Sequence, residues 1–203
     1  MDDGQRLLTR VEDVSFWWHS IDVGDGVVTP GRKSLAELES RLSDLGLPDL
    51  RGKTVLDIGA WDGYFSFAAE RLGAARVVAL DHYVWAYDFG GEPGAVRHSD
   101  GRHRRPDEDP VRWRPGAWPG KRGFDLAHEA LGSNVEQVIG DFMAMDLNAL
   151  GMFDVVLYLK VLYHMEDPLR ARCARRGKGV AHSGTAGLGS GAHDRHSDRG
   201  LGR

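Results

Sequence analysis

The stretch TVLDIGAWDGYFSF, residues 54–67, decides the fold of this chain. It begins with an apolar run broken only by Asp57, and a short apolar run that ends at a glycine is typical of a buried parallel strand. Gly59 and Gly63 lie in the turn that follows, and apolar residues then recur at helical spacing. Glycines let a backbone approach a ligand closely, and a helix N-terminus favours polar or anionic groups. The stretch therefore predicts a strand, a ligand-binding turn and a helix.

The next apolar run extends this unit into a parallel sheet. Residues 76–80 read RVVAL and are followed by Asp81. A strand, a helix and a second strand within about 30 residues form a right-handed βαβ unit, in which the two strands are parallel. We expect Asp57 and Asp81 to lie at the carboxyl ends of neighbouring strands, the edge where open α/β sheets bind ligands.

The same alternation continues on both sides of this unit. Ser34 opens a capping box before a stripe of leucines, which predicts a helix packed against the sheet. Further along, residues 123–131 are predicted to form a helix, and residues 135–139 and 153–159 a third and a fourth strand. We therefore predict an α/β, Rossmann-like, doubly wound domain with a mainly parallel sheet over residues 34–168.

Residues 1–33 form a leader before this domain. Apolar residues at helical spacing over residues 7–14 predict a short amphipathic helix. Trp17, Trp18 and His19 follow beside a glycine-rich turn. Two interpretations stay open: the tryptophans anchor the leader to the core, or the leader caps the functional site and brings His19 or the nearby Thr29 to the ligand.

Residues 82–122 form an unusually long connection, in which three tryptophans alternate with arginines, prolines and glycines. A long loop inside a compact domain tends to be functional or disordered. Arginine and tryptophan together can stack on bases or hold phosphates, although nearby acidic residues offset much of the positive charge. The segment is open to three interpretations: a lid that faces the substrate, a mobile insertion, or a contact surface for RNA.

Composition restricts the class of protein. The chain has 203 residues, of which 41% are hydrophobic and 28% charged, and its net charge of −4 gives no overall attraction to nucleic acid. Cys173 is the only cysteine, so no disulfide can form within the chain and a reducing compartment is expected. We find no apolar signal core, membrane-spanning run or metal-ligand cluster in the sequence. We expect a cytoplasmic protein with neither a membrane nor a metal partner, and the oligomeric state stays open.

Residues 169–203 depart from the pattern of the domain. They are rich in Arg, Gly, Ala, His and Ser and show neither a strand pattern nor an amphipathic helix. One interpretation is a disordered tail. The other is a frameshift or truncation near Leu169, because a GC-rich gene read out of frame gives such a composition. In either case the last strands of the sheet should be missing, and translating the other two frames of the gene would separate the two interpretations.

The glycine turn resembles motif I of class I S-adenosylmethionine-dependent methyltransferases, in which an acidic residue precedes three alternating glycines. Trp61 stands here in place of the middle glycine. The resemblance implies S-adenosylmethionine as cofactor, with an acid after the second strand for the ribose hydroxyls and an acid and an aromatic residue after the third for adenine. The cofactor-binding residues that it implies are Asp57, Gly59, Ala60, Trp61, Gly63, Tyr64, Asp81, His82, Asp141, Phe142 and Tyr158.

Four segments carry a narrower resemblance. Residues 17–31 (WWHSIDVGDGVVTPG), 56–67, 123–133 and 161–169 (VLYHMEDPL) are similar to the family of tRNA wobble-uridine (5-methoxyuridine) methyltransferases. Lys160, just before the last segment, stands where that family usually has glycine. The resemblance implies a methyl acceptor on a tRNA or on a small molecule.

The implied reaction is in-line transfer of a sulfonium methyl group to an oxygen, nitrogen or carbon nucleophile. The protein mainly positions the reactants and excludes water. His164 and His19 are candidate general bases for a hydroxyl acceptor, and Tyr163 is a candidate for orienting it.

Two alternatives remain open for the chain as a whole. One is a catalytically impaired relic that at most binds the cofactor. The other is a nicotinamide-dependent oxidoreductase, whose G-x-G-x-x-G fingerprint residues 59–64 do not supply.

Overall fold

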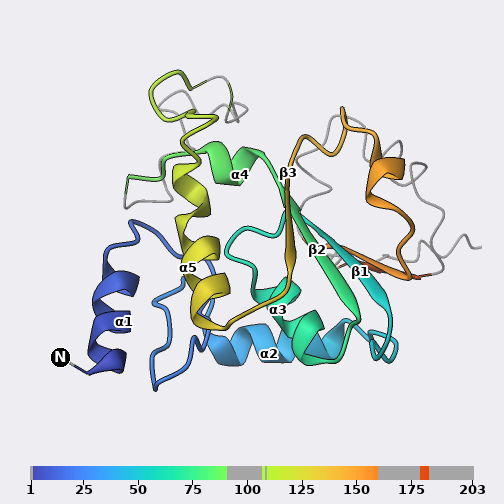
Figure 1. Cartoon of the computed structure of the whole chain (residues 1–203), viewed down its shortest axis with the longest axis horizontal. Coiled ribbons are helices and arrows are strands. Elements are labelled where there is room, and N and C mark those ends of the chain that lie inside the picture. Colours follow the sequence, from blue (N-terminus) through green and yellow to red (C-terminus); the bar gives the residue numbers. More distant parts are fainter. Residues whose placement is uncertain (1, 91–106, 108, 160–178, 183–203) are drawn as a thin grey trace, which may run out of the picture.

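A parallel sheet forms the centre of the molecule (Figure 1). The computed structural model describes residues 2–90, 107, 109–159 and 179–182. Within them five strands lie in the order β3-β2-β1-β4-β5, and every neighbouring pair is parallel. The strands are β1 (Thr54–Ile58), β2 (Arg76–Asp81), β3 (Glu136–Ile139), β4 (Val155–Tyr158) and β5 (Gly179–His182). The predicted α/β class and the parallel sheet are confirmed.

The two faces of the sheet are covered by different parts of the chain. Alternate strand residues such as Val55, Val77 and Leu157 share one buried cluster with residues of α1, α2, α3 and α5. The intervening residues, among them Leu56 and Val78, pack instead with the segment between β3 and β4. The helices are α1 (Asp3–Glu12), α2 (Leu35–Asp44), α3 (Tyr64–Arg71), α4 (Tyr83–Ala86) and α5 (Arg122–Ala130), with 3₁₀ turns η3 (Pro119–Lys121) and η4 (Leu147–Leu150). The two-residue period of a strand therefore sorts its side chains between two cores.

Local signals set the position of α2 as predicted. The side chain of Ser34 accepts the backbone N–H of Glu37 at 3.3 Å, which satisfies one of the free donors of the first turn. Leu38 is buried, and the other leucines of the stripe pack partly buried against the same core. The capping box and the leucine stripe thus fix both the start of the helix and the face that it buries.

Side chains at the end of α1 and just after it attach the leader to the domain. Trp17 is buried, and its Nε1 donates to the carbonyl oxygen of Val11 at 3.1 Å. Arg10 pairs with both oxygens of Glu129 on α5, at 3.0 and 2.6 Å. Thr29 is also buried, and its hydroxyl accepts the backbone N–H of Ile21 at 2.8 Å and donates to the carbonyl of His19 at 3.0 Å, both within the leader. The structure thus places Trp17 where the anchoring interpretation requires it.

The two ends of the long connection lie side by side. Tyr87 and Trp113 form an antiparallel bridge, and the backbone N–H of Asp88 donates to the carbonyl of Arg112 at 2.9 Å. The backbone N–H of Arg114 completes this pairing by donating to the carbonyl of Ala86 at 2.8 Å. The connection therefore has a paired base, while most of residues 91–108 lie outside the described part and their three interpretations stay predictions.

The prediction that no strand follows residue 168 is wrong. Residues 179–182 form β5, which pairs with β4 so that Val155 lies opposite Gly179 and Tyr158 opposite His182. A four-residue strand paired through its backbone with a buried neighbour needs no long apolar run of its own. The composition of residues 169–203 therefore gave no signal for this strand. The frameshift or truncation near Leu169 stays a prediction.

Candidate functional site

Four neighbouring strands bring the residues selected from the sequence to one edge of the sheet. The turn at residues 59–63 follows β1, and Asp81 is the last residue of β2. Asp141 lies two residues beyond β3, and Tyr158 ends β4. In Figure 1 this edge is the upper end of the sheet, next to α4. All of these positions lie at carboxyl ends of parallel strands, as the βαβ pattern predicted.

The turn after β1 requires glycine at two positions. Gly59 has a φ of +78°, and its N–H donates to the carbonyl of Leu80 at 2.7 Å, which holds the turn against β2. Gly63 has a φ of +88°, and a Cβ there would lie 2.7 Å from the rings of Phe124 and Phe67. A left-handed backbone disfavours a side chain at both positions, and at Gly63 the aromatic rings also leave no room for one. The turn is therefore fixed by backbone bonds and packing.

Asp81 connects the end of β2 to the turn that follows β1. Its carboxylate accepts the backbone N–H of Trp61 at 3.0 Å, of His82 at 2.7 Å and of Val84 at 3.2 Å. Burial raises the pKa of Asp81 to about 6, although these backbone donors act in the opposite direction. A carboxylate has about four lone-pair positions, and these three backbone donors occupy most of them.

Asp57 lies beneath the turn. It is buried, and it accepts the hydroxyl of Ser66 at 2.6 Å, which bonds β1 to α3. Burial raises the pKa of Asp57 to about 7, and the negative charge of Asp81 adds to this shift. Asp57 is thus a carboxyl group whose protonation is sensitive to any charge that enters the neighbouring turn.

Asp62 is a residue of the site that the sequence analysis missed. One of its oxygens, Oδ2, accepts the backbone N–H groups of Trp18 at 2.6 Å and His19 at 2.7 Å, and it lies 3.7 Å from Nδ1 of His19. Its other oxygen makes no hydrogen bond within the described residues, and a Cβ on Gly123 would lie 3.2 Å from it. Burial raises the pKa of Asp62 to about 7. An acid inside the glycine turn was the signal that could have identified this contact.

Of the three residues predicted to lie near adenine, one lies at the edge of the sheet and two lie in the core. Asp141 lies at the edge, where it accepts the hydroxyl of Tyr83 at 3.2 Å and the backbone N–H of Met143 at 2.8 Å. Phe142 and Tyr158 are buried in the second core, with their rings edge to face at 5.4 Å. The carboxylate thus lies at the edge of the sheet, whereas the two aromatic rings belong to the core.

His82 lies among aromatic rings at the same edge. Its ring is edge-on to Tyr83 at 5.0 Å and to Trp113 at 5.3 Å, and it lies 6.1 Å from the ring of Trp118. Its Nδ1 atom is buried and has no hydrogen-bond partner within the part of the chain that the structure describes. An unsatisfied buried polar group is costly, so this nitrogen is a candidate for a hydrogen bond to a ligand.

The remaining predicted residues divide into buried ones and ones outside the described part. Ala60 and Tyr64 are buried beside the turn. His19 is buried in the leader, edge-on to the ring of Phe65 at 5.9 Å. Tyr163 and His164 lie outside the described residues.

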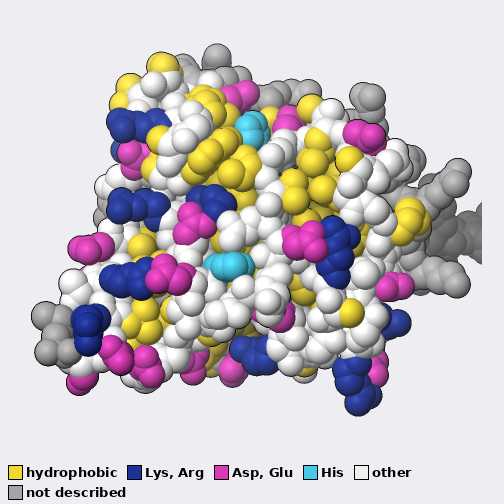
Figure 2. Space-filling model, in the orientation of Figure 1, with side chains coloured by type: hydrophobic (Ala, Val, Ile, Leu, Met, Phe, Trp, Pro, Cys, Tyr) yellow, Lys and Arg dark blue, Asp and Glu magenta, His cyan; other side chains and the backbone are white. Residues whose placement is uncertain are grey.

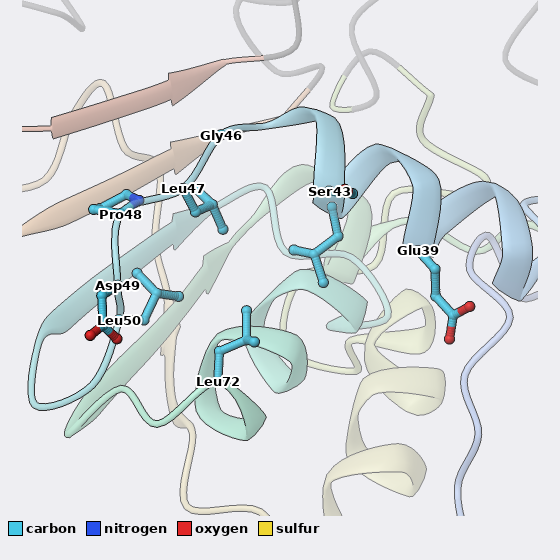
Figure 3. A pocket seen from close by; sticks show the side chains of 9 residues that line it. Glu39, Ser43, Gly46, Leu47, Pro48, Asp49, Leu50 and Leu72 are labelled. Carbon is cyan, nitrogen blue, oxygen red and sulfur yellow. The ribbon is translucent and has the colours of Figure 1, made fainter.

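A cavity at the opposite edge of the sheet is a different feature. It has a volume of about 450 Å³ and lies between the end of α2, the chain before β1 and the end of α3 (Figure 3). Its lining residues are Glu39, Leu42, Ser43, Gly46, Leu47, Pro48, Asp49, Leu50 and Leu72. Because Leu50 precedes β1 and Leu72 precedes β2, the cavity lies at the amino ends of the strands. It is therefore separate from the edge that holds Asp81.

The surface view agrees with a mixed polar and apolar edge. Figure 2 shows hydrophobic side chains gathered around α4 and, across β3, over the segment that follows it.

Among the described residues, no helix combines the length and the apolar composition that a membrane span requires. The same described residues contain no group of three or more His, Cys, Asp or Glu side chains that could hold a metal ion.

Comparisons with known proteins identify the fold. No protein-family model matches the chain, and no curated protein matches it. The solved structure of the N-terminal domain of EvdMO1 with SAH bound is similar, with a TM-score of 0.59 and 18% sequence identity. The match covers 90% of this chain and 65% of that one. The same domain in the presence of SAH and D-fucose gives a TM-score of 0.58 and 19% identity over 90% of this chain and 64% of that one.

The longer EvdMO1 structure shows how much of that protein the match covers. It gives a TM-score of 0.53 and 19% identity over 84% of this chain, but only 32% of EvdMO1. The chain therefore spans about a third of EvdMO1 and just under two thirds of its N-terminal domain. At this identity the likeness establishes the fold alone, which is a Rossmann-like, mainly parallel α/β architecture shared with the N-terminal domain of EvdMO1.

Proposed function

We propose that this chain is an S-adenosylmethionine-dependent methyltransferase. It binds the cofactor at the carboxyl edge of β1, β2 and β3 and moves the methyl group to an oxygen, nitrogen or carbon nucleophile of a small molecule or of a tRNA wobble uridine. The observation that carries the proposal is the convergence of the glycine turn, Asp81 and Asp141 at one edge. The solved N-terminal domain of EvdMO1, which has the same fold, was obtained with SAH bound.

The residues at this edge fit the parts of the cofactor. Asp81 lies beside the turn at the end of β2, where the sequence resemblance implies the acid that contacts the ribose hydroxyls. His82, with a buried Nδ1 that lacks a partner within the described residues, and Asp141 offer one nitrogen and one carboxylate for the polar edge of adenine. The turn offers backbone at Gly59 and Gly63, where no side chain blocks close approach.

The charge of the site also suits a cationic ligand. Asp57, Asp62 and Asp81 are all buried around the turn, and burial raises the pKa of each. A positive charge placed near such groups stabilises their ionised forms, because attraction is strong where water is excluded. The bound cofactor supplies a methyl group already activated by a positively charged sulfonium. The protein then needs to orient the reactants and exclude water.

A general base for a hydroxyl acceptor is proposed in the leader. The ring of His19 lies beside the carboxylate of Asp62, with Nδ1 3.7 Å from Oδ2. His164 and Tyr163 stay proposals for the same step on the strength of the sequence resemblance. The described residues do not favour a tRNA over a small molecule as acceptor.

Calorimetric titration of the full chain with SAH (S-adenosylhomocysteine) tests the proposal. We expect the wild type to bind, Asp81→Asn to bind far more weakly, and Asp49→Asn to bind like the wild type. Asp49 is a matched control because it is an exposed aspartate that lines the cavity at the opposite edge. Absence of SAH binding to the folded wild type would overturn the proposal.

A second experiment separates the proposed enzyme from the alternatives. Labelled S-adenosylmethionine is incubated with unmodified tRNA and, separately, with small hydroxyl compounds that include D-fucose, which was present with SAH in one EvdMO1 structure. Label transferred to either acceptor class supports methyl transfer and names the class. Binding of SAH without transfer to any acceptor supports the relic, and binding of NADH in place of SAH supports the oxidoreductase.

A further inference from the structure

We infer that Trp61 is a positioning residue, whose ring fastens the leader and the base of the long connection to the cofactor turn. The inference rests on the proposed function, because it gives the turn a second task besides holding the cofactor. The acceptor side of the site is then assembled by contacts within the chain before any ligand binds. Four observations lead to this conclusion.

The ring of Trp61 is stacked between two parts of the chain. It lies parallel to the ring of Trp18 in the leader, with centroids 4.8 Å apart and planes 7° apart. It also stacks on Phe89, at the base of the connection, at 5.4 Å and 21°. Phe16 closes the group, at 6.1 Å from Trp61, 6.4 Å from Trp18 and 5.2 Å from Phe89. Leader, turn and connection thus meet in one aromatic group.

The backbone of Trp61 is unfavourable for its side chain. Its φ is +51°, in the left-handed region that residues other than glycine rarely adopt. Glycine, which stands at this position in the motif that the turn resembles, would hold the same conformation without steric cost. The tryptophan is therefore not required by the turn itself, and the stacked ring gives it a different role.

Two hydrogen bonds hold the backbone from which this ring projects. The backbone N–H of Trp61 donates to Asp81 at 3.0 Å, and its carbonyl accepts Nε1 of Trp85 at 2.8 Å. Trp85 is fully buried, with the ammonium of Lys121 5.2 Å from its ring centroid. Both backbone bonds of residue 61 remain when the side chain is changed, so a substitution there tests the ring alone.

The next residue holds the same part of the leader by a different interaction. Asp62 accepts the backbone N–H groups of Trp18 and His19 at 2.6 and 2.7 Å. Trp61 therefore holds Trp18 by its ring, while Asp62 holds Trp18 and His19 by their backbone. The position of His19, the proposed base, follows from the turn in this way.

Three variants of the full chain test the role of the ring. Trp61→Gly and Trp61→Asn both accept a positive φ and remove the ring, whereas Trp61→Phe keeps an aromatic ring. Trypsin cleavage after Arg32 and Lys33 reports on attachment of the leader, because Lys33 bonds through its backbone to Trp18 and Ser20. We expect faster cleavage there in the Gly and Asn variants, and cleavage close to the wild-type rate in the Phe variant.

Spectroscopy and kinetics complete the test. Two stacked indoles give an exciton-coupled circular dichroism signal, which we expect in the wild type and not in Trp61→Gly or Trp18→Ala. With the acceptor class identified, we expect kcat of Trp61→Gly to fall about tenfold or more, since a small misplacement of reactants can cost about 100-fold.

The outcomes separate this inference from the proposed function. Wild-type cleavage and wild-type kcat in Trp61→Gly would overturn it, and so would a Trp61→Gly chain that fails to fold, because the ring would then hold the domain rather than the leader. Cleavage and circular dichroism need no ligand. They therefore decide the role of Trp61 even if the wild type binds no SAH, a result that would overturn only the proposed function.

Discussion

The carboxylate of Asp81, at the end of β2, accepts the backbone N–H of Trp61, in the turn after β1, at 3.0 Å. One side chain thus fixes the distance between two strand ends, at the place where the proposed cofactor would lie. The bond crosses from one strand of the βαβ unit to the turn that follows the other. A change at Asp81 is therefore expected to affect both the turn and the ligand.

The first prediction concerns Asp81→Asn. In the wild type, backbone N–H groups donate to both oxygens of the Asp81 carboxylate. In the variant, the NH₂ group of the asparagine side chain would face some of these donors and could not accept from them. We expect a loss of about 1–3 kcal/mol in the free energy of unfolding, and SAH binding weaker by about 10- to 100-fold, since hydrogen bonds to a charged group contribute about 1.5–3 kcal/mol. Urea unfolding and calorimetric titration measure the two effects. Unchanged SAH affinity would show that Asp81 does not contact the ribose.

The second prediction compares two glycines of similar backbone conformation. Gly63 has a φ of +88° and two aromatic rings 2.7 Å from where a Cβ would stand, whereas Gly24 has a φ of +91° and nothing within 4 Å. We expect Gly24→Ala to cost about 1–2 kcal/mol from backbone strain. Gly63→Ala should cost about 1–3 kcal/mol more, because it also overpacks the core. Equal losses in urea unfolding would mean that the rings move aside freely.

The third prediction concerns pH and Asp57. Burial raises the pKa of Asp57 to about 7 in the folded chain, against about 3.9 in an unfolded one. The folded state therefore keeps its proton where the unfolded state has lost it. The contribution of Asp57 to stability is complete below about pH 4 and is lost as the pH rises through about 7.

Asp57→Asn removes this titration and keeps an oxygen for Ser66. The free energy of unfolding of the variant relative to the wild type should increase from pH 4 to pH 7, by on the order of 4 kcal/mol if the pKa difference is fully expressed. Urea unfolding of both proteins at several pH values measures the change. A difference that does not vary with pH would contradict the raised pKa of Asp57.

The fourth prediction concerns the hydroxyl beneath the turn. Ser66 is fully buried, and it donates to Asp57 at 2.6 Å. Ser66→Ala leaves that carboxyl without this donor and should cost about 1–3 kcal/mol. We expect a larger loss at pH 8 than at pH 5, because the ionised carboxylate depends more on the donor. In the background of Asp57→Asn, which keeps a neutral acceptor for this hydroxyl, the loss should not vary between pH 5 and pH 8, and a loss that still rises with pH there would show that a group other than Asp57 causes it.

The strands and helices that the sequence predicted are those with a clear local signal. The βαβ unit from Thr54 to Asp81 has a continuous apolar run, glycines at the turn and a helical stripe, and the structure keeps all three. By contrast, β5 has no such signal, since its place in the sheet depends on pairing with β4. Element ends also differ by a few residues, as at β4, which is shorter than the predicted 153–159.

The site residues also divide into those that a local sequence signal predicts and those that tertiary contacts place. The sequence placed Asp57, Asp81 and Asp141 at one edge, because parallel strands put their carboxyl ends together. It did not place Asp62 against the leader. That contact joins Asp62 to Trp18, which is 44 positions away in the chain, and to His19, which is 43 positions away. The depth of Phe142 and Tyr158 in the second core was likewise set by packing between distant segments.

The sequence by itself determined the parallel sheet, the glycine turn and the edge where the acidic residues gather, because periodicity and turn chemistry act between near neighbours. Only the tertiary structure decided that Trp61 is stacked between Trp18 and Phe89, and that Asp62 holds the leader. Contacts of this kind depend on where separate segments fold back on one another. The geometry of the whole domain fixes them, and no local pattern of residues records it.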